Sequence, residues 1–208
     1  KLRGIEKAFP GYYVTIASSS RDDAEIVLYV RSDKDPGGFY IFNTETNELK
    51  DLGMNTRGWI KSEEMTEMEP ISFKARDGLE INGYLTRPKS KKENLPMVMF
   101  VHGGPHGVRD YWRYDSQVQF LANRGYAVMQ LNYRGSGGYG MDFLEAGFLN
   151  WGTTMQDDLT DGAEWAINNG IANRNRLCIY GASYGGYAAL MSVCLLYTSP
   201  SPRDNSGS

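Results

Sequence analysis

The chain has 208 residues, 41% of them hydrophobic, and a formal net charge of −3 at pH 7. This composition suits one or two folded domains, and the charge argues against a nucleic-acid partner or an anionic membrane surface. The two cysteines, Cys178 in an expected core strand and Cys194 near the end, are too few for a disulfide framework. No apolar run reaches the ~18 residues that a transmembrane helix needs. The sequence begins at Lys1 without a methionine or a signal-peptide pattern. We therefore expect a piece of a longer protein, and we expect it in the cytoplasm, with a periplasmic or secreted location left open.

The first part of the chain predicts four short antiparallel strands separated by polar or Gly-Pro turns, at residues 12–17, 25–31, 39–43 and 49–52. Four such strands in about 45 residues match the size of one β-propeller blade. Because one blade cannot bury both of its own faces, we expect neighbouring blades. A small antiparallel subdomain is the alternative interpretation of the same strands.

Residues 54–70 are polar and rich in glutamate, which indicates a linker. Residues 71–75 and 79–85 then alternate apolar with other side chains around Asp77-Gly78, and this pattern predicts a hairpin that opens a second domain.

From residue 95 onward, apolar strands alternate with amphipathic helices. The expected order is a strand at 97–101, a helix at 115–124, a strand at 126–131, a helix from about 154 to Gly170 and a buried strand at 177–180. The helix from 154 has acids in its first turn, Asp157 and Asp158, as the helix dipole favours. Its expected core stripe is Met155, Leu159, Ala163 and Ala166-Ile167. The run at 97–101 is apolar throughout, as in a strand covered on both faces of a parallel sheet. The sequence therefore predicts the α/β class, with a mostly parallel sheet and flanking helices.

Residues 181–185 read Gly-Ala-Ser-Tyr-Gly, a G-x-S-x-G pattern between the last expected strand and a helix opening at Gly186. This context is that of a nucleophile elbow, in which a strained turn exposes the serine hydroxyl at the positive end of a helix dipole. The pattern is weak by itself, and a glycine-rich turn with an ordinary serine is the alternative. The flanking strand and helix favour Ser183 as a nucleophile.

A second motif, His102-Gly103-Gly104-Pro105, directly follows the expected strand at 97–101. Acyl transfer places negative charge on a carbonyl oxygen, and fixed N–H donors must face it. We expect the Gly104 backbone amide as one donor, with Gly103 as a near alternative, and the Tyr184 amide as the other. A plain Gly-Pro turn is the competing interpretation.

His102 and His106 are the only histidines. The glycines and Pro105 around them disfavour a helix, so the two side chains would not lie on one helix face. We therefore expect no metal site. Neither is expected to be the general base, because in α/β-hydrolases that histidine follows the serine. The glycines at 135, 137 and 140 fit a dinucleotide-binding pattern, but the acids that follow, Asp157 and Asp158, open a helix rather than end a second strand. We therefore expect no cofactor.

Taken together, the motifs resemble the prolyl oligopeptidase family of serine peptidases, most closely its acylaminoacyl-peptidase-like and dipeptidyl-peptidase-like branch. The resemblance covers Ile71 to about Val193 and is carried by residues 75–85, 102–107, 132–140, 151–152, 156–158 and 181–187. It implies a β-propeller ahead of an α/β-hydrolase domain, Ser183 as nucleophile, and the Gly104 and Tyr184 amides as oxyanion donors. The family also needs an aspartate and a histidine after the serine, but the last 25 residues contain no histidine and only one acid, Asp204.

The expected organisation is a partial propeller at 1–53, a linker at 54–70, the N-terminal part of a hydrolase domain at 71–193, and a non-native, disordered tail at 194–208. The tail is Pro- and Ser-rich and resembles a translated sequencing adapter. We expect the parent protein to hydrolyse short peptides through an acyl-enzyme on Ser183, and the 208-residue chain itself to be inactive. A carboxylesterase and a non-catalytic binding module are the alternatives. The sequence does not indicate an oligomeric state.

Overall fold

The computed structural model describes residues 2–53 and 58–195. Residues 54–57 of the expected linker and 196–208 of the expected tail lie outside the described residues. The chain divides into two compact units, Lys1–Met68 with Trp112–Gln119, and Glu69–Tyr111 with Phe120–Ser208.

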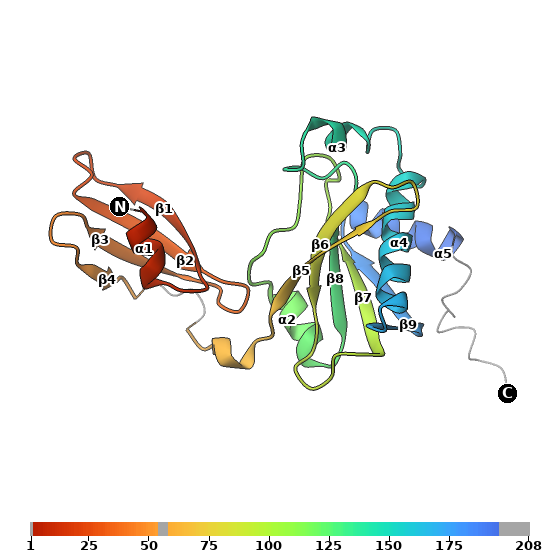
Figure 1. The fold of residues 1–208 in the computed structure, drawn as a ribbon, viewed down its shortest axis with the longest axis horizontal. Coiled ribbons are helices and arrows are strands. Elements are labelled where there is room, and N and C mark those ends of the chain that lie inside the picture. Colours follow the sequence, from red (N-terminus) through yellow and green to blue (C-terminus); the bar gives the residue numbers. More distant parts are fainter. Residues whose placement is uncertain (1, 54–57, 196–208) are drawn as a thin grey trace. The chain divides into compact units, whose positions relative to one another are not determined.

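The first unit contains a four-stranded antiparallel sheet in the order β1-β2-β3-β4 (Figure 1). Its strands are β1 (Tyr13–Ser19), β2 (Glu25–Arg31), β3 (Gly38–Asn43) and β4 (Leu49–Asp51), so all four predicted strands are confirmed within two residues. A short helix that the sequence analysis did not predict, α1 (Leu2–Ala8), adds the buried side chain of Ile5 to a small core with Val14, Leu28 and Val30. The sheet has the size and order of a single propeller blade.

Residues 112–119 belong to this first unit, although they follow the first strands of the hydrolase-like part in the sequence. The side-chain amide of Gln119 donates to the carbonyl oxygen of Thr66 (2.8 Å) and accepts from its N–H (3.0 Å). The backbone N–H of Tyr114 donates to the carbonyl oxygen of Ser32 (2.8 Å). In the stretch before β5, the described residues 58–67 contain a 3-10 turn, η1 (Ser62–Glu64).

The second unit is built on a five-stranded sheet in the order β5-β6-β8-β7-β9. The strands are β5 (Met68–Lys74), β6 (Glu80–Thr86), β7 (Leu95–Val101), β8 (Ala127–Asn132) and β9 (Ala172–Gly181). β7 pairs in parallel with β8 and β9, whereas β6 pairs antiparallel with β8. The α/β class is confirmed, and parallel pairing is concentrated in β8-β7-β9, the part of the sheet that ends at the predicted motifs.

The helices are α2 (Ser116–Asn123), α3 (Met141–Glu145), α4 (Thr154–Asn168) and α5 (Tyr184–Leu195). α4 and α5 pack against β9 and against each other (Figure 1). The predicted stripe of α4 is confirmed, because Met155, Leu159 and Ala166 are all buried in the core of this unit. None of the described helices has the length and apolar character needed to cross a membrane.

The prediction of a buried strand at 177–180 is wrong in one respect. β9 is the outermost strand of the described sheet, so α4 and α5 cover only one of its faces. Leu177 and Ile179 point to that face and are half-buried, whereas Cys178 and Tyr180 are exposed. Cys178 is therefore not the core residue that the apolar run indicated.

Candidate active site

Ser183 lies in the sharp turn between β9, which ends at Gly181, and α5, which begins at Tyr184. Its φ angle is +56°, a left-handed conformation that costs a residue with a Cβ atom about 1–2 kcal/mol. The side chain is exposed. A strained, exposed serine at the first turn of a helix is the geometry that the G-x-S-x-G pattern predicts.

The two glycines of this turn are required by the end of β7. A Cβ atom on Gly181 would lie 2.5 Å from the carbonyl oxygen of Val101, and one on Gly185 would collide with the same oxygen. The backbone of the turn can therefore approach β7 only because both positions lack side chains. This close approach fixes Ser183 above the carboxyl ends of the parallel strands.

The loop after β7 brings Gly103 directly against the serine. A Cβ atom on Gly103 would lie 3.3 Å from Cβ and 3.8 Å from Oγ of Ser183. Gly104, the next residue, is exposed and has a φ angle of +124°, which favours glycine. Among the described residues, neither the Gly104 N–H nor the Tyr184 N–H donates a hydrogen bond. Both backbone amides that the sequence analysis expected as oxyanion donors therefore have no hydrogen-bond acceptor among the described residues.

Both ring nitrogens of His102 contact groups other than Ser183. Nδ1 lies 2.8 Å from the carbonyl oxygen of Gly103, and Nε2 lies 3.1 Å from Oγ of Ser136. The ring stacks on Tyr133 with centroids 4.4 Å apart, and the Tyr133 hydroxyl donates to the carbonyl oxygen of His102 (2.8 Å). Burial lowers the pKa of His102, so the imidazole is neutral at pH 7.

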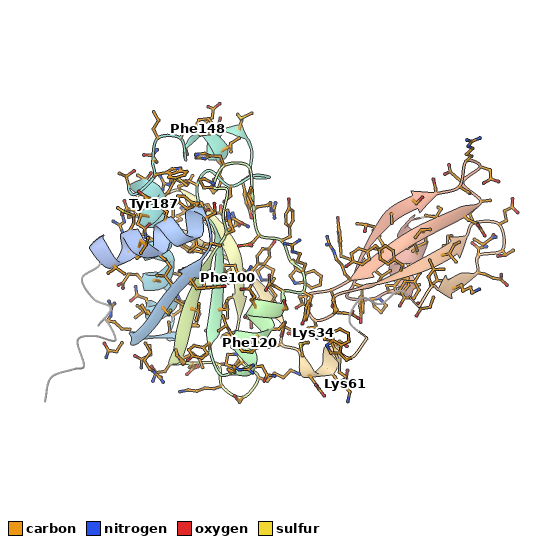
Figure 2. All side chains as sticks on the ribbon, turned by 180° about the vertical axis from the view of Figure 1, so that it is seen from behind. Lys34, Lys61, Phe100, Phe120, Phe148 and Tyr187 are labelled. Carbon is orange, nitrogen blue, oxygen red and sulfur yellow. The ribbon has the colours of Figure 1, made fainter. Side chains whose placement is uncertain are left out.

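His106 packs into a cluster of aromatic rings beside the elbow. Its ring meets Phe148 edge-on at 5.0 Å, and its Nε2 lies 3.4 Å from the indole nitrogen of Trp151. Trp151 in turn lies 5.0 Å from Tyr184 and 5.5 Å from Tyr187, and Figure 2 marks Phe148 and Tyr187. The sequence analysis did not find this cluster, although Phe148 and Trp151 stand close together in a stretch of small and polar residues.

Neither histidine forms a hydrogen bond with Ser183 in the part of the chain that the structure describes. Nor does either belong to a group of three or more potential metal ligands among those residues. Both rings serve instead to pack and hydrogen-bond the loop that carries Gly103 and Gly104.

Residues 112–196 match the prolyl oligopeptidase family. The chain is 34% identical over 200 residues to dipeptidyl aminopeptidase BIII of Pseudoxanthomonas mexicana, a match that covers 92% of this chain and 29% of that protein. The solved structure of puromycin hydrolase superposes with a TM-score of 0.76 at 26% identity, over 90% of this chain and 29% of that one. An acylaminoacyl peptidase in complex with Z-Gly-Gly-Phe-chloromethyl ketone gives a TM-score of 0.72 at 27% identity, over 91% and 30%.

The chain belongs to the prolyl oligopeptidase family. It spans less than a third of the length of the curated relatives that it matches. Those relatives are named as peptidases, which agrees with the resemblance drawn from the motifs.

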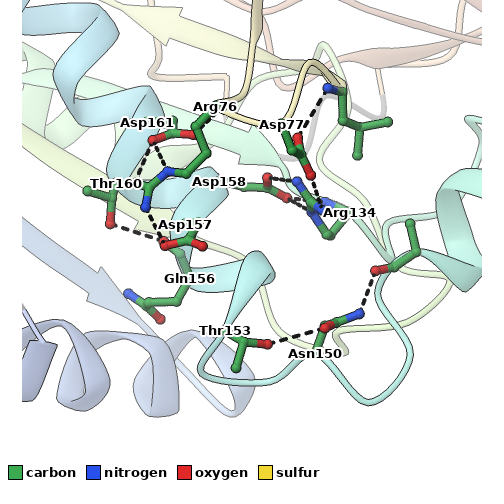
Figure 3. A network of polar contacts seen from close by, with 12 residues as sticks. Arg76, Asp77, Arg134, Asn150, Thr153, Gln156, Asp157, Asp158, Thr160 and Asp161 are labelled. Carbon is green, nitrogen blue, oxygen red and sulfur yellow. Dashed lines mark hydrogen bonds and ion pairs between the residues drawn. The ribbon is translucent and has the colours of Figure 1, made fainter.

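In this member of the prolyl oligopeptidase family, the acids at 157 and 158 form ion pairs (Figure 3). Asp158 is fully buried and binds Arg134 through two side-chain hydrogen bonds of 2.9 and 2.7 Å and one backbone hydrogen bond of 2.9 Å. Asp77 also binds Arg134 (2.7 Å), and Arg76 pairs with Asp157 (2.8 Å). Asp158 therefore neutralises a buried cation, rather than only complementing the helix dipole as its place in the first turn indicated.

Arg134 begins the glycine-rich loop that resembled a dinucleotide site. The N–H of Gly137 donates to the carbonyl oxygen of Val108 (3.1 Å), and the N–H of Gly107 donates to that of Gly135 (3.0 Å). A Cβ atom on Gly137 would collide with the carbonyl oxygen of Gly107. The glycines thus let this loop lie against the loop that follows β7, and the hydrogen bonds to Asp158 hold the base of the loop on α4.

Proposed function

We propose that the protein carrying this chain is a serine peptidase that hydrolyses short peptides through an acyl-enzyme on Ser183. The main support for this proposal is the strained, exposed backbone position of Ser183, next to Gly103 and at the first turn of α5. The names of the relatives support a peptide as substrate, since they include a dipeptidyl aminopeptidase and an acylaminoacyl peptidase bound to a peptide chloromethyl ketone.

In the first step, Oγ of Ser183 attacks the scissile carbonyl carbon and gives up its proton to a general base. The carbonyl π electrons move to the oxygen, where the N–H groups of Gly104 and Tyr184 stabilise the negative charge. Collapse of this intermediate breaks the C–N bond, and the leaving amine takes the proton from the base. Water then hydrolyses the ester and releases the acid. One oxyanion donor of this kind contributes about 100- to 1000-fold to kcat.

We propose further that the 208-residue chain by itself does not turn over peptides. A serine hydroxyl is a weak nucleophile without a base to accept its proton. His102 has both ring nitrogens engaged, and His106 is bound to Trp151. The base therefore comes from elsewhere in the whole protein, which accords with the chain's spanning less than a third of its relatives.

A fluorophosphonate probe tests the proposal on the longest natural protein that contains this chain. The probe should label Ser183, and the label should disappear in Ser183→Ala, together with cleavage of dipeptide or acylated amino-acid p-nitroanilides. Labelling that persists in Ser183→Ala would refute the assignment of the nucleophile.

The same experiment separates the two alternatives. Turnover of simple p-nitrophenyl esters without cleavage of any aminopeptide or acylpeptide would favour a carboxylesterase. Absence of labelling in a protein with a native circular dichroism spectrum would favour a non-catalytic binding module.

A further inference from the structure

Arg109 lies in the loop after β7, and two tyrosine rings border its guanidinium. Its Cζ atom lies 4.8 Å from the ring centroid of Tyr111 and 4.8 Å from that of Tyr139. Its Nε–H donates to the carbonyl oxygen of Asp110 (3.2 Å). These contacts restrain the guanidinium before any ligand arrives, so less side-chain freedom is lost when a ligand binds to it.

The end of β8 and the loop that follows it support this arrangement. A Cβ atom on Gly138, which has a φ angle of +84°, would lie 2.6 Å from Nη1 and 3.2 Å from Cδ of Arg109. The fully buried amide of Asn132 donates to the Tyr139 hydroxyl (2.8 Å) and to the carbonyl oxygen of Asp110 (3.2 Å). Its oxygen accepts from the Asp110 N–H (2.7 Å). Asn132 therefore holds both one of the rings and the carbonyl that binds Nε.

Arg109 has no acidic partner among the described residues, whereas the arginine of the neighbouring loop has two. Arg134, at the start of the loop after β8, forms salt bridges of 2.7 Å with Asp158 and with Asp77. Arg109 is half-buried, and its Nη1 and Nη2 groups donate to no residue in the described part of the chain. A planar, positively charged pair of N–H donors without an acceptor matches a carboxylate, which can accept two parallel hydrogen bonds.

Arg109 also lies within reach of a short peptide bound at Ser183. A Cβ atom on Gly103 would lie 3.3 Å from Cβ of Ser183. A Cβ atom on Gly104 would lie 3.0 Å from Cβ of Val108, the residue before Arg109. Since successive Cα atoms are about 3.8 Å apart, these contacts place the Cα atom of Arg109 no more than about 19 Å from Cβ of Ser183. An extended peptide rises about 3.3 Å per residue, so roughly six residues span this distance.

We propose that Arg109 binds a carboxylate of the peptide substrate through paired hydrogen bonds from its guanidinium to the two carboxylate oxygens. The carboxylate is either the free C-terminus of a short peptide or the side chain of an acidic residue, and both offer the same two acceptors. The inference rests on the proposed function and adds to it a preference for substrates with a negative charge near the scissile bond.

The test uses the longest natural protein that contains this chain and two pairs of peptides, with the products separated by chromatography. All the peptides share the residues of a p-nitroanilide that the protein cleaves. The first pair differs only in a free or an amidated C-terminus. The second pair is amidated and carries Glu or Gln, placed at each position in turn. We expect the wild type to prefer the carboxylate of one pair by about 10- to 100-fold in kcat/KM, mainly through KM, because the ground state and the transition state make the same contact.

Two variants of Arg109 and one control measure its part in this preference. Arg109→Met keeps an unbranched side chain beside the rings but removes the charge and the donors, so the preference should fall below about threefold. Arg109→Lys keeps the charge without the paired donors and should give an intermediate preference. The matched control is Arg124→Met. Arg124 also lies over a ring, 3.5 Å from the centroid of Phe120, but it precedes β8 and is thus at the opposite end of that strand from Asn132. Its loss should leave the preference unchanged.

The two pairs identify the source of the carboxylate. A preference confined to the first pair and lost in Arg109→Met assigns the C-terminus, and one confined to the second pair assigns an acidic side chain. Equal kcat/KM within both pairs in the wild type overturns the inference. A preference that survives in Arg109→Met, or that falls equally in Arg124→Met, overturns it too. If Arg109→Met does not fold, Arg109→Gln replaces it with the same expectation. Cleavage that persists in Ser183→Ala would instead refute the proposed function.

Discussion

The left-handed backbone of Ser183 makes a prediction about stability that reverses the usual rank of alanine and glycine. In Ser183→Ala the Cβ atom remains at a φ of +56°, and the cost of about 1–2 kcal/mol is retained. In Ser183→Gly this cost disappears, but the unfolded chain gains conformational freedom worth about 0.4–1 kcal/mol. Both substitutions remove the hydroxyl, so their difference isolates the backbone. We expect Ser183→Gly to be more stable than Ser183→Ala by about 0.5–1 kcal/mol.

Urea unfolding of the 208-residue chain measures this difference. Circular dichroism at 222 nm follows mainly the helices, of which α4 and α5 are the longest described. The urea concentrations at the midpoints of the two unfolding curves are compared with the same dependence of free energy on urea concentration. A higher midpoint then means a larger free energy of unfolding. Asn168, at the end of α4, supplies the control, and there glycine should be less stable than alanine by about 0.5–1 kcal/mol.

A second control uses Leu149, which is fully exposed at a φ of +59°. Here too glycine should be more stable than alanine, without any effect on the site. If Ser183→Ala proves as stable as Ser183→Gly while Leu149 and Asn168 behave as expected, the serine is not strained and the elbow geometry is refuted.

Three further predictions concern the neighbouring contacts. Asp158→Asn leaves the Arg134 guanidinium buried beside a neutral amide, so the free energy of unfolding should fall by about 3–5 kcal/mol; a loss below about 1 kcal/mol in urea titration would contradict the burial of this pair. Gly185→Ala forces a Cβ atom onto the carbonyl oxygen of Val101 and should cost at least about 1–3 kcal/mol, whereas an unchanged Tm would show that the turn can move away. Because burial lowers the pKa of His102 below its ordinary value of 6.5, the unfolded chain takes up this proton first as the pH falls. The free energy of unfolding should therefore decrease below about pH 6.5 and do so less steeply in His102→Asn, and equal slopes would contradict the burial of the imidazole.

Local patterns predicted the elements that depend on local chemistry. The polar and Gly-Pro turns between short strand-like segments located β1 to β4, and the glycines and the serine of residues 181–185 located the turn between β9 and α5. The same patterns missed α1 and α3, which have seven and five residues. Helices of this length are too short for an amphipathic repeat to show, and packing rather than propensity stabilises them.

The remaining differences arise from contacts between residues far apart in the sequence. Nothing local marks Asp158 as the partner of Arg134, because an acid in the first turn of a helix is common for reasons of the dipole alone. An apolar run likewise cannot tell a central strand from an outer one, which is why Cys178 was placed in the core.

The first unit is discontinuous, and this has a consequence for how the protein is made. The ribosome produces residues 1–68 first, and residues 69–111 follow before 112–119 exist. Translation proceeds at roughly 5–20 residues per second. The Gln119 side chain, which donates to the carbonyl oxygens of Asp33 and Thr66, is therefore synthesised several seconds after those residues. The first unit thus gains these hydrogen bonds outside its sheet only after β7 and the loop that carries Gly103 have been synthesised. The first unit is therefore completed only after residues 69–111 of the second unit have been synthesised. Residues 1–68 expressed by themselves would lack the hydrogen bonds that Gln119 makes.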